Sequence, residues 1–90
     1  DVLVTIWSEE TAGESLKLAG ELRARGLRVL VYPEADKLGK QFKYASQINA
    51  PFVCVVGKDE LAENRVTLKN MQTGEQETVS REAVVEKIKG

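Results

Sequence analysis

The chain has 90 residues, of which 42% are hydrophobic and 30% charged, and its formal net charge is -1. This length suits one domain with a single core and is too short for two domains. No apolar run approaches the roughly 18–20 residues that cross a bilayer. No basic segment followed by an apolar one opens the chain, as it would in a secretory signal. We therefore expect a cytoplasmic protein without a membrane partner, and the first residue, Asp1 rather than Met, suggests a segment of a longer polypeptide.

The chain contains one cysteine, Cys54, and no histidine. An intrachain disulfide is therefore impossible, and zinc sites built from Cys and His are excluded. A Ser-His-Asp triad and a Cys-His pair are excluded as well, because the general base is missing. Cys54 lies within the apolar run PFVCVVG, so we expect a buried, unreactive thiol.

The first third of the chain predicts a strand, a helix and a second strand. Residues 2–7 are apolar and β-branched without alternation, which is typical of a strand covered on both faces. Ser8 is suited to cap a helix over residues 11–25, and Gly26 is suited to end it with a positive φ. A short strand follows at residues 28–32. The apolar positions of this helix recur at helical spacing and are Leu16, Ala19, Leu22 and Ala24.

The middle of the chain predicts a second helix and a third strand. Asp36 is suited to cap a helix from Lys37 to about Asn49, and residues 51–56 form a buried strand that Gly57 ends. One face of this helix carries Leu38, Phe42, Ala45 and Ile48.

The last third predicts a hairpin and a final helix. Residues 66–71 alternate between apolar and polar, Thr73-Gly74 gives a turn, and residues 76–79 return as the partner strand. Ser80 then caps a helix whose inward positions are Ala83, Val84 and Ile88.

The element order is therefore β-α-β-α-β-β-β-α, over a single domain of residues 1–90. Right-handed crossovers make the first strands parallel, and the tight turn makes the hairpin antiparallel. We predict an α/β fold with three layers, α/β/α, around a five-stranded mixed sheet.

The segment of residues 37–58 holds the most informative charges, because it contains four lysines and no acid. Lys37, Lys40 and Lys43 recur every three residues along the second helix. They could follow the phosphates of a nucleic acid, with Gln41 and Tyr44 adding hydrogen bonds or stacking. The alternative interpretation is an ordinary solvated helix face.

A second candidate region follows the third strand, where Lys58 and Glu60 lie at the sheet edge that binds ligands in open α/β folds. Glu60 could accept hydrogen bonds from a base edge, or be an ordinary loop acid. Lys69, on the polar side of the fourth strand, could contact RNA or only water.

Three segments resemble the C-terminal anticodon-binding domain of histidyl-tRNA synthetases. They are LGKQFKYA at residues 38–45, FVCVVGKDEL at residues 52–61, and VTLKNMQTGEQ at residues 66–76 followed by SRE at residues 80–82. The resemblance covers nearly the whole chain in order. It implies the class II anticodon-binding fold, shared with threonyl-, prolyl- and glycyl-tRNA synthetases, with the anticodon loop over the carboxyl edge of the sheet.

The resemblance also implies roles for particular residues. Positions matching Glu60 and Lys69 contact anticodon bases in threonyl-type relatives, and Gln41 and Lys43 border the loop. No class II catalytic motif is present, so no cofactor is expected in this domain, and ATP and Mg²⁺ are expected in the catalytic domain of the parent chain. The parent is expected to be a homodimer. The predicted RNA-contacting residues are Lys37, Lys40, Gln41, Lys43, Lys58, Glu60 and Lys69.

We therefore expect recognition of the anticodon stem-loop of tRNA-His, in support of ATP-dependent aminoacylation by a catalytic domain outside these 90 residues. Two alternatives stay open at this point. One is the tRNA-binding domain of a synthetase-like regulatory protein, and the other is a small α/β interaction module with no RNA role.

Overall fold

The fold is built on one mixed sheet with two parallel and two antiparallel strand pairs. The computed structural model describes residues 2–32, 36–57, 63 and 65–89. The sheet has the order β2-β1-β3-β4-β5, in which β1 pairs parallel with β2 and β3, and the other pairings are antiparallel. The strands are β1 (Val2–Val4), β2 (Val29–Val31), β3 (Phe52–Val55), β4 (Arg65–Asn70) and β5 (Gln76–Ser80). The predicted five-stranded mixed sheet is confirmed.

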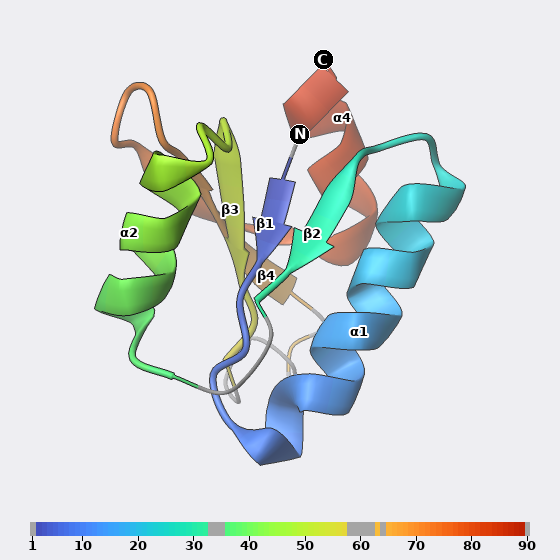
Figure 1. Ribbon diagram of the computed structural model, residues 1–90. Coiled ribbons are helices and arrows are strands. Elements are labelled where there is room, and N and C mark those ends of the chain that lie inside the picture. The colour runs from blue at the N-terminus through green and yellow to red at the C-terminus, as the bar shows by residue number, and fades with distance from the viewer. Residues whose placement is uncertain (1, 33–35, 58–62, 64, 90) are drawn as a thin grey trace.

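The helices cover both faces of this sheet, which confirms the predicted three layers. Helix α1 and helix α4 lie against one face, and α2 lies against the other (Figure 1). Each face has its own core: the one on the α1 side is built around Leu18, Leu22 and Val84, and the one on the α2 side around Leu3 and Val53. The helices are α1 (Glu9–Ala24), α2 (Leu38–Gln47), the 3-10 turn η1 (Arg81–Ala83) and α4 (Val84–Lys89).

Helix α1 begins with the predicted Ser8 cap and ends before the predicted Gly26. The Ser8 hydroxyl accepts a hydrogen bond from the Thr11 amide, and the Thr11 hydroxyl accepts one from the Ser8 amide. Gly26 has a φ of 93°, a conformation that glycine adopts without steric cost. The predicted apolar positions were partly wrong as a buried face, because Leu16 is 57% exposed and Ala24 is also exposed, while Leu18 is buried.

The start of α2 also differs from the prediction. Its N-cap is Lys37 and not Asp36, and no side chain caps the helix. The Asp36 carboxylate instead accepts a hydrogen bond from the Lys37 amide at 2.8 Å. Ile48, predicted to face inward, is 37% exposed because it follows the last helical turn.

The hairpin turn, the final helix and the buried thiol follow the predictions in outline. Gly74 has a φ of 80° in the connection between β4 and β5. The final helix starts as the 3-10 turn η1, with Ser80 at its N-cap but without a side-chain cap bond. Cys54 is fully buried in β3, and burial raises the pKa of its thiol to about 12. Over the described residues, no helix has the length and apolar character needed to cross a membrane.

Candidate nucleic-acid interface

The lysines of α2 form an exposed band on the outward side of the helix. Leu38, Phe42 and Ala45 face the sheet, whereas Lys37, Lys40 and Lys43 are exposed. Each three-residue step turns the direction of the side chain by about 60° on a helix of 3.6 residues per turn. Lys40 and Lys43 therefore point in different directions on the solvent side of α2, and the exposed Lys37 precedes them as the N-cap. Such an arrangement suits successive phosphates of a curved backbone.

Contacts on each flank of α2 fix how this band lies on the molecule. On one flank the Tyr44 ring meets the Tyr32 ring beyond β2, with centroids 5.6 Å apart and the planes at 80°. On the other flank the Phe42 ring meets Lys69 of β4, whose ammonium nitrogen lies 4.6 Å from the ring centroid. The lysine band therefore lies above the sheet between its β2 edge and its β4 side.

Lys69 is half-buried on the polar side of β4, as predicted, and it lies back from the carboxyl end of β3. It pairs with Val53, two residues before the end of β3 at Val55. At about 3.3 Å per residue, this places Lys69 about 7 Å back from the end of the strand. The ammonium group accordingly lies over the α2 face of the sheet, where the Phe42 ring holds it by a cation–π contact, and not at the carboxyl edge.

The same side of the β4–β5 hairpin presents polar groups. Thr67 pairs with Thr78, and their hydroxyl oxygens lie 3.4 Å apart. Lys69 pairs with the exposed Gln76. The alternate residues Val66 and Leu68 are buried on the opposite, α1 side of the sheet. Hydroxyl, amide and ammonium groups therefore share one accessible sheet face, which can exchange hydrogen bonds with unpaired bases.

Gln41 is the predicted contact residue that the structure excludes from this surface. Its side chain is fully buried, and the amide nitrogen donates to the carbonyls of Ile6 and Asp36 at 2.8 Å each. The amide oxygen accepts from the Ile6 amide, also at 2.8 Å. With both ends of the amide engaged inside the protein, Gln41 has no accessible group for RNA. It joins the start of α2 to the segment after β1.

Two further predicted residues, Lys58 and Glu60, lie outside the described residues. The buried Gly57, which follows β3, is described immediately before them. Their predicted contacts with RNA therefore stay predictions. Among the described residues, no group of three or more His, Cys, Asp or Glu side chains could hold a metal ion.

Trp7 was predicted to end a strand covered on both faces, and this was wrong, because β1 ends at Val4 and Trp7 is exposed. Its side chain is 49% exposed, directly after the buried Ile6. An open groove of about 600 Å³ is lined by Trp7, Asp36, Lys37 and Leu38. The available signal was its place in the sequence, one step beyond a buried segment. The N-termini of α1 and α2 lie at the end of the sheet where β1 ends (Figure 1).

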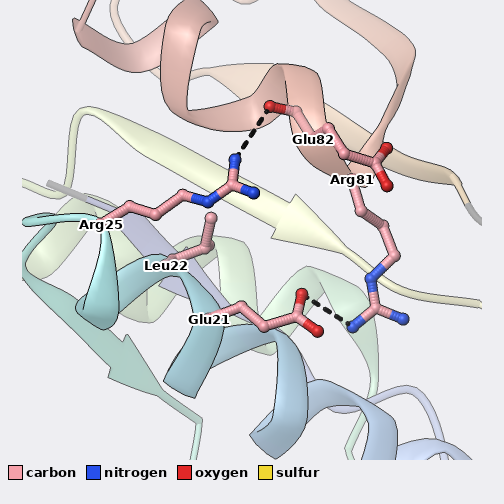
Figure 2. A pocket seen from close by; sticks show the side chains of 5 residues that line it. All are labelled: Glu21, Leu22, Arg25, Arg81 and Glu82. Carbon is pink, nitrogen blue, oxygen red and sulfur yellow. Dashed lines mark hydrogen bonds and ion pairs between the residues drawn. The ribbon is translucent and has the colours of Figure 1, made fainter.

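A second cleft, of about 340 Å³, lies on the other face of the molecule, between α1 and η1 (Figure 2). Arg81 reaches from η1 to the carboxylates of Glu14 at 3.5 Å and Glu21 at 3.3 Å. Arg25 donates a hydrogen bond to the backbone carbonyl of Glu82 at 3.4 Å. These charged groups tie the C-terminal segment to α1, so the cleft is a structural junction.

The observed architecture defines a class of small α/β domain that presents a basic helix and an open polar sheet face on one side. The family model described as "Anticodon binding domain" matches residues 1–90, and the chain belongs to that family.

The relatives agree with this assignment. A histidine–tRNA ligase of Porphyromonas gingivalis is 45% identical over 82 residues, which are 91% of this chain and 18% of that protein. The crystal structure of histidyl-tRNA synthetase from Nostoc sp. PCC 7120 matches with a TM-score of 0.94 and 36% identity, over 98% of this chain and 21% of that one. The RNA-binding domain of threonyl-tRNA synthetase from Cryptosporidium parvum Iowa II shares the fold, with a TM-score of 0.91 at 23% identity, over 99% of this chain and 22% of that one. The chain thus spans about a fifth of the length of these proteins.

Proposed function

We propose that this chain binds the anticodon stem-loop of tRNA-His as one domain of a histidine–tRNA ligase. The observation that carries the proposal is the continuous polar side of the molecule, where the exposed lysines of α2 adjoin Lys69 and the open face of the β4–β5 hairpin. Membership of the anticodon-binding family and the identity to histidine–tRNA ligases support the choice of ligand.

The residues divide into two roles under this proposal. Lys37, Lys40 and Lys43 contact phosphates, which positions the RNA without reading its sequence. Lys69 contacts a base, because the Phe42 ring holds its ammonium group in one place over the sheet. We propose base contact for Glu60 on the resemblance alone, and RNA contact for Lys58 because it closes the acid-free lysine segment of residues 37–58.

The remainder of the proposed parent protein supplies the chemistry. A catalytic domain there holds ATP, Mg²⁺ and histidine, and the parent is a cytoplasmic homodimer. Anticodon binding by this domain need not be tight on its own, since a second contact on the same tRNA raises the effective concentration. The net charge of -1 is compatible with such a shared role.

The test is a titration of the 90-residue chain with a fluorescently labelled tRNA-His anticodon stem-loop at two salt concentrations. A matched stem-loop with its anticodon bases changed should bind more weakly. Lys40→Ala should weaken the binding of both stem-loops alike. It should also lower the slope of log affinity against log salt concentration by roughly 0.7–0.9, as the loss of one phosphate contact does. Lys69→Ala should reduce the discrimination between the loops by about 1–3 kcal/mol.

Lys17→Ala is the matched control, because Lys17 is an exposed helical lysine on α1, on the other side of the sheet. It should leave both affinities unchanged. Equal binding of the two stem-loops by the native chain would refute sequence-specific recognition. Unchanged discrimination in both Glu60→Ala and Lys69→Ala would show that the base contacts lie elsewhere.

A further inference from the structure

Trp7 forms one wall of an open groove at the end of the sheet. The other wall is the start of α2, with Asp36, Lys37 and Leu38. The groove is shallow and open to solvent, so it can cover only one side of a bound group. The indole is 49% exposed, which leaves an aromatic face available to a ligand.

Both walls of this groove are held in place by one buried side chain. Gln41 donates hydrogen bonds to the carbonyls of Ile6, which precedes Trp7, and of Asp36, which precedes Lys37. It also accepts one from the Ile6 amide. The distance between the walls is thus set before any ligand arrives, which lowers the entropic cost of binding.

The charges around the groove are unequal on its two sides. On the α2 side, Lys37 and Lys40 are exposed, and a carboxylate oxygen of Asp36 lies 3.4 Å from the Tyr32 hydroxyl. On the α1 side, Glu9 and Glu10 are exposed in the first helical turn. A phosphate is therefore favoured beside Lys37 and disfavoured beside α1. The Asp36 carboxylate can accept hydrogen bonds from amino or imino groups.

We propose that this groove takes one unpaired nucleotide of the bound RNA, with its base stacked on Trp7 and its phosphate beside Lys37. An aromatic face, a cation and a carboxylate acceptor together match a base, its phosphate and its hydrogen-bond donors. The inference rests on the proposed function and extends the contact surface from the α2 face to the edge beyond β1. Gln41 acts as the positioning residue of this subsite.

Trp7 is the single tryptophan of the chain, so its fluorescence reports on this groove alone. The 90-residue chain is titrated with the anticodon stem-loop while two signals are followed: the anisotropy of a label on the RNA and the Trp7 emission. Stacking should quench the emission, with the same midpoint as the anisotropy change. A series of stem-loops with one abasic nucleotide each should contain one member that binds without the quench.

Substitutions give a second, independent readout. Trp7→Ala should weaken binding roughly 5- to 150-fold, the range expected for the loss of one stacked base, and Trp7→Phe should retain most of the affinity. Leu16→Ala removes another exposed apolar side chain, on α1, and should change nothing. The quench in the native chain does not depend on how any variant folds.

The outcomes separate the inference from the proposed function. RNA binding by anisotropy with unchanged Trp7 emission, or with full affinity in Trp7→Ala, would overturn the stacking site and leave anticodon binding in place. The stacking site would be overturned in the same way if every abasic stem-loop still quenched the emission, or if a protein segment rather than RNA covered Trp7. Absence of any RNA binding by the folded chain would refute both proposals.

Discussion

Replacement of Gln41 by methionine should destabilise the fold far more than an ordinary change of a polar helix residue. The two side chains have similar volumes and similar helix propensities, so packing and helix formation change little. What is lost is three hydrogen bonds of 2.8 Å, two to Ile6 and one to Asp36.

The magnitude follows from the groups left without a partner. Ile6 is only 5% exposed, so its amide and its carbonyl both stay buried when the glutamine amide is removed. Each orphaned group costs about 1–3 kcal/mol, or about 2–6 kcal/mol for the two. The Asp36 carbonyl is in a partly exposed residue and can regain water, so it is left out of this sum. This loss is a large fraction of the free energy of unfolding of a typical domain, which is about 5–15 kcal/mol.

Urea unfolding followed by far-ultraviolet circular dichroism measures this loss. Gln47→Met is the matched control, because Gln47 is exposed at the end of the same helix, and it should fall within about 0.5 kcal/mol of the native chain. Hydrogen exchange at the Ile6 amide should accelerate in Gln41→Met only. Equal stabilities of the two variants would refute the role that we assign to Gln41.

Three other predictions test separate parts of the fold. Burial raises the pKa of Cys54 from 9.0 to about 12, so the contribution of this thiol to stability is complete below about pH 9 and is lost as the pH rises towards 12. The difference in unfolding free energy between the native chain and Cys54→Ala should shrink over that window. A constant difference would contradict the raised pKa of Cys54. Arg81→Met removes the ion pairs with the partly exposed Glu14 and Glu21 and should lower the free energy of unfolding by about 0.5–1 kcal/mol, with faster amide hydrogen exchange in α4. Unchanged exchange in α4 would show that these ion pairs do not hold the helix. Gly26→Ala forces a φ of 93° on a residue with a Cβ and should lower the free energy of unfolding by about 1 kcal/mol, measured by thermal unfolding. Gly20→Ala has open space around its Cβ and should stabilise the chain. Equal effects of the two substitutions would contradict the strain at Gly26.

The element order could be predicted from the sequence because each signal is local. Ser8 and Gly26 frame α1, and the Thr73-Gly74 turn sets the hairpin, without reference to distant residues. The register of a helix against a sheet is not local. Leu16 and Leu18 both suit an apolar stripe, and only contact with the strands decides that Leu18 is buried and Leu16 exposed.

The candidate site was predictable to the extent that it depends on exposed charge. Lys37, Lys40 and Lys43 are exposed, as expected for either a phosphate-binding band or a solvated face. Gln41 lies in the same segment, but its burial depends on the backbone of Ile6, 35 residues earlier, which no local pattern reveals. The place of Lys69 over the sheet likewise depends on how β4 pairs with β3.

The most direct test of RNA binding on the α2 side is a map of the amide resonances that move when the isotopically labelled 90-residue chain binds the tRNA-His anticodon stem-loop. We predict shifts along α2, around Lys69 and Thr78, and at Trp7, with the α1 and α4 surface around Arg81 unchanged. Shifts centred on the α1 and α4 surface, with α2 and the open hairpin face unaffected, would contradict the central claim that the α2 side of the sheet is the RNA-binding side.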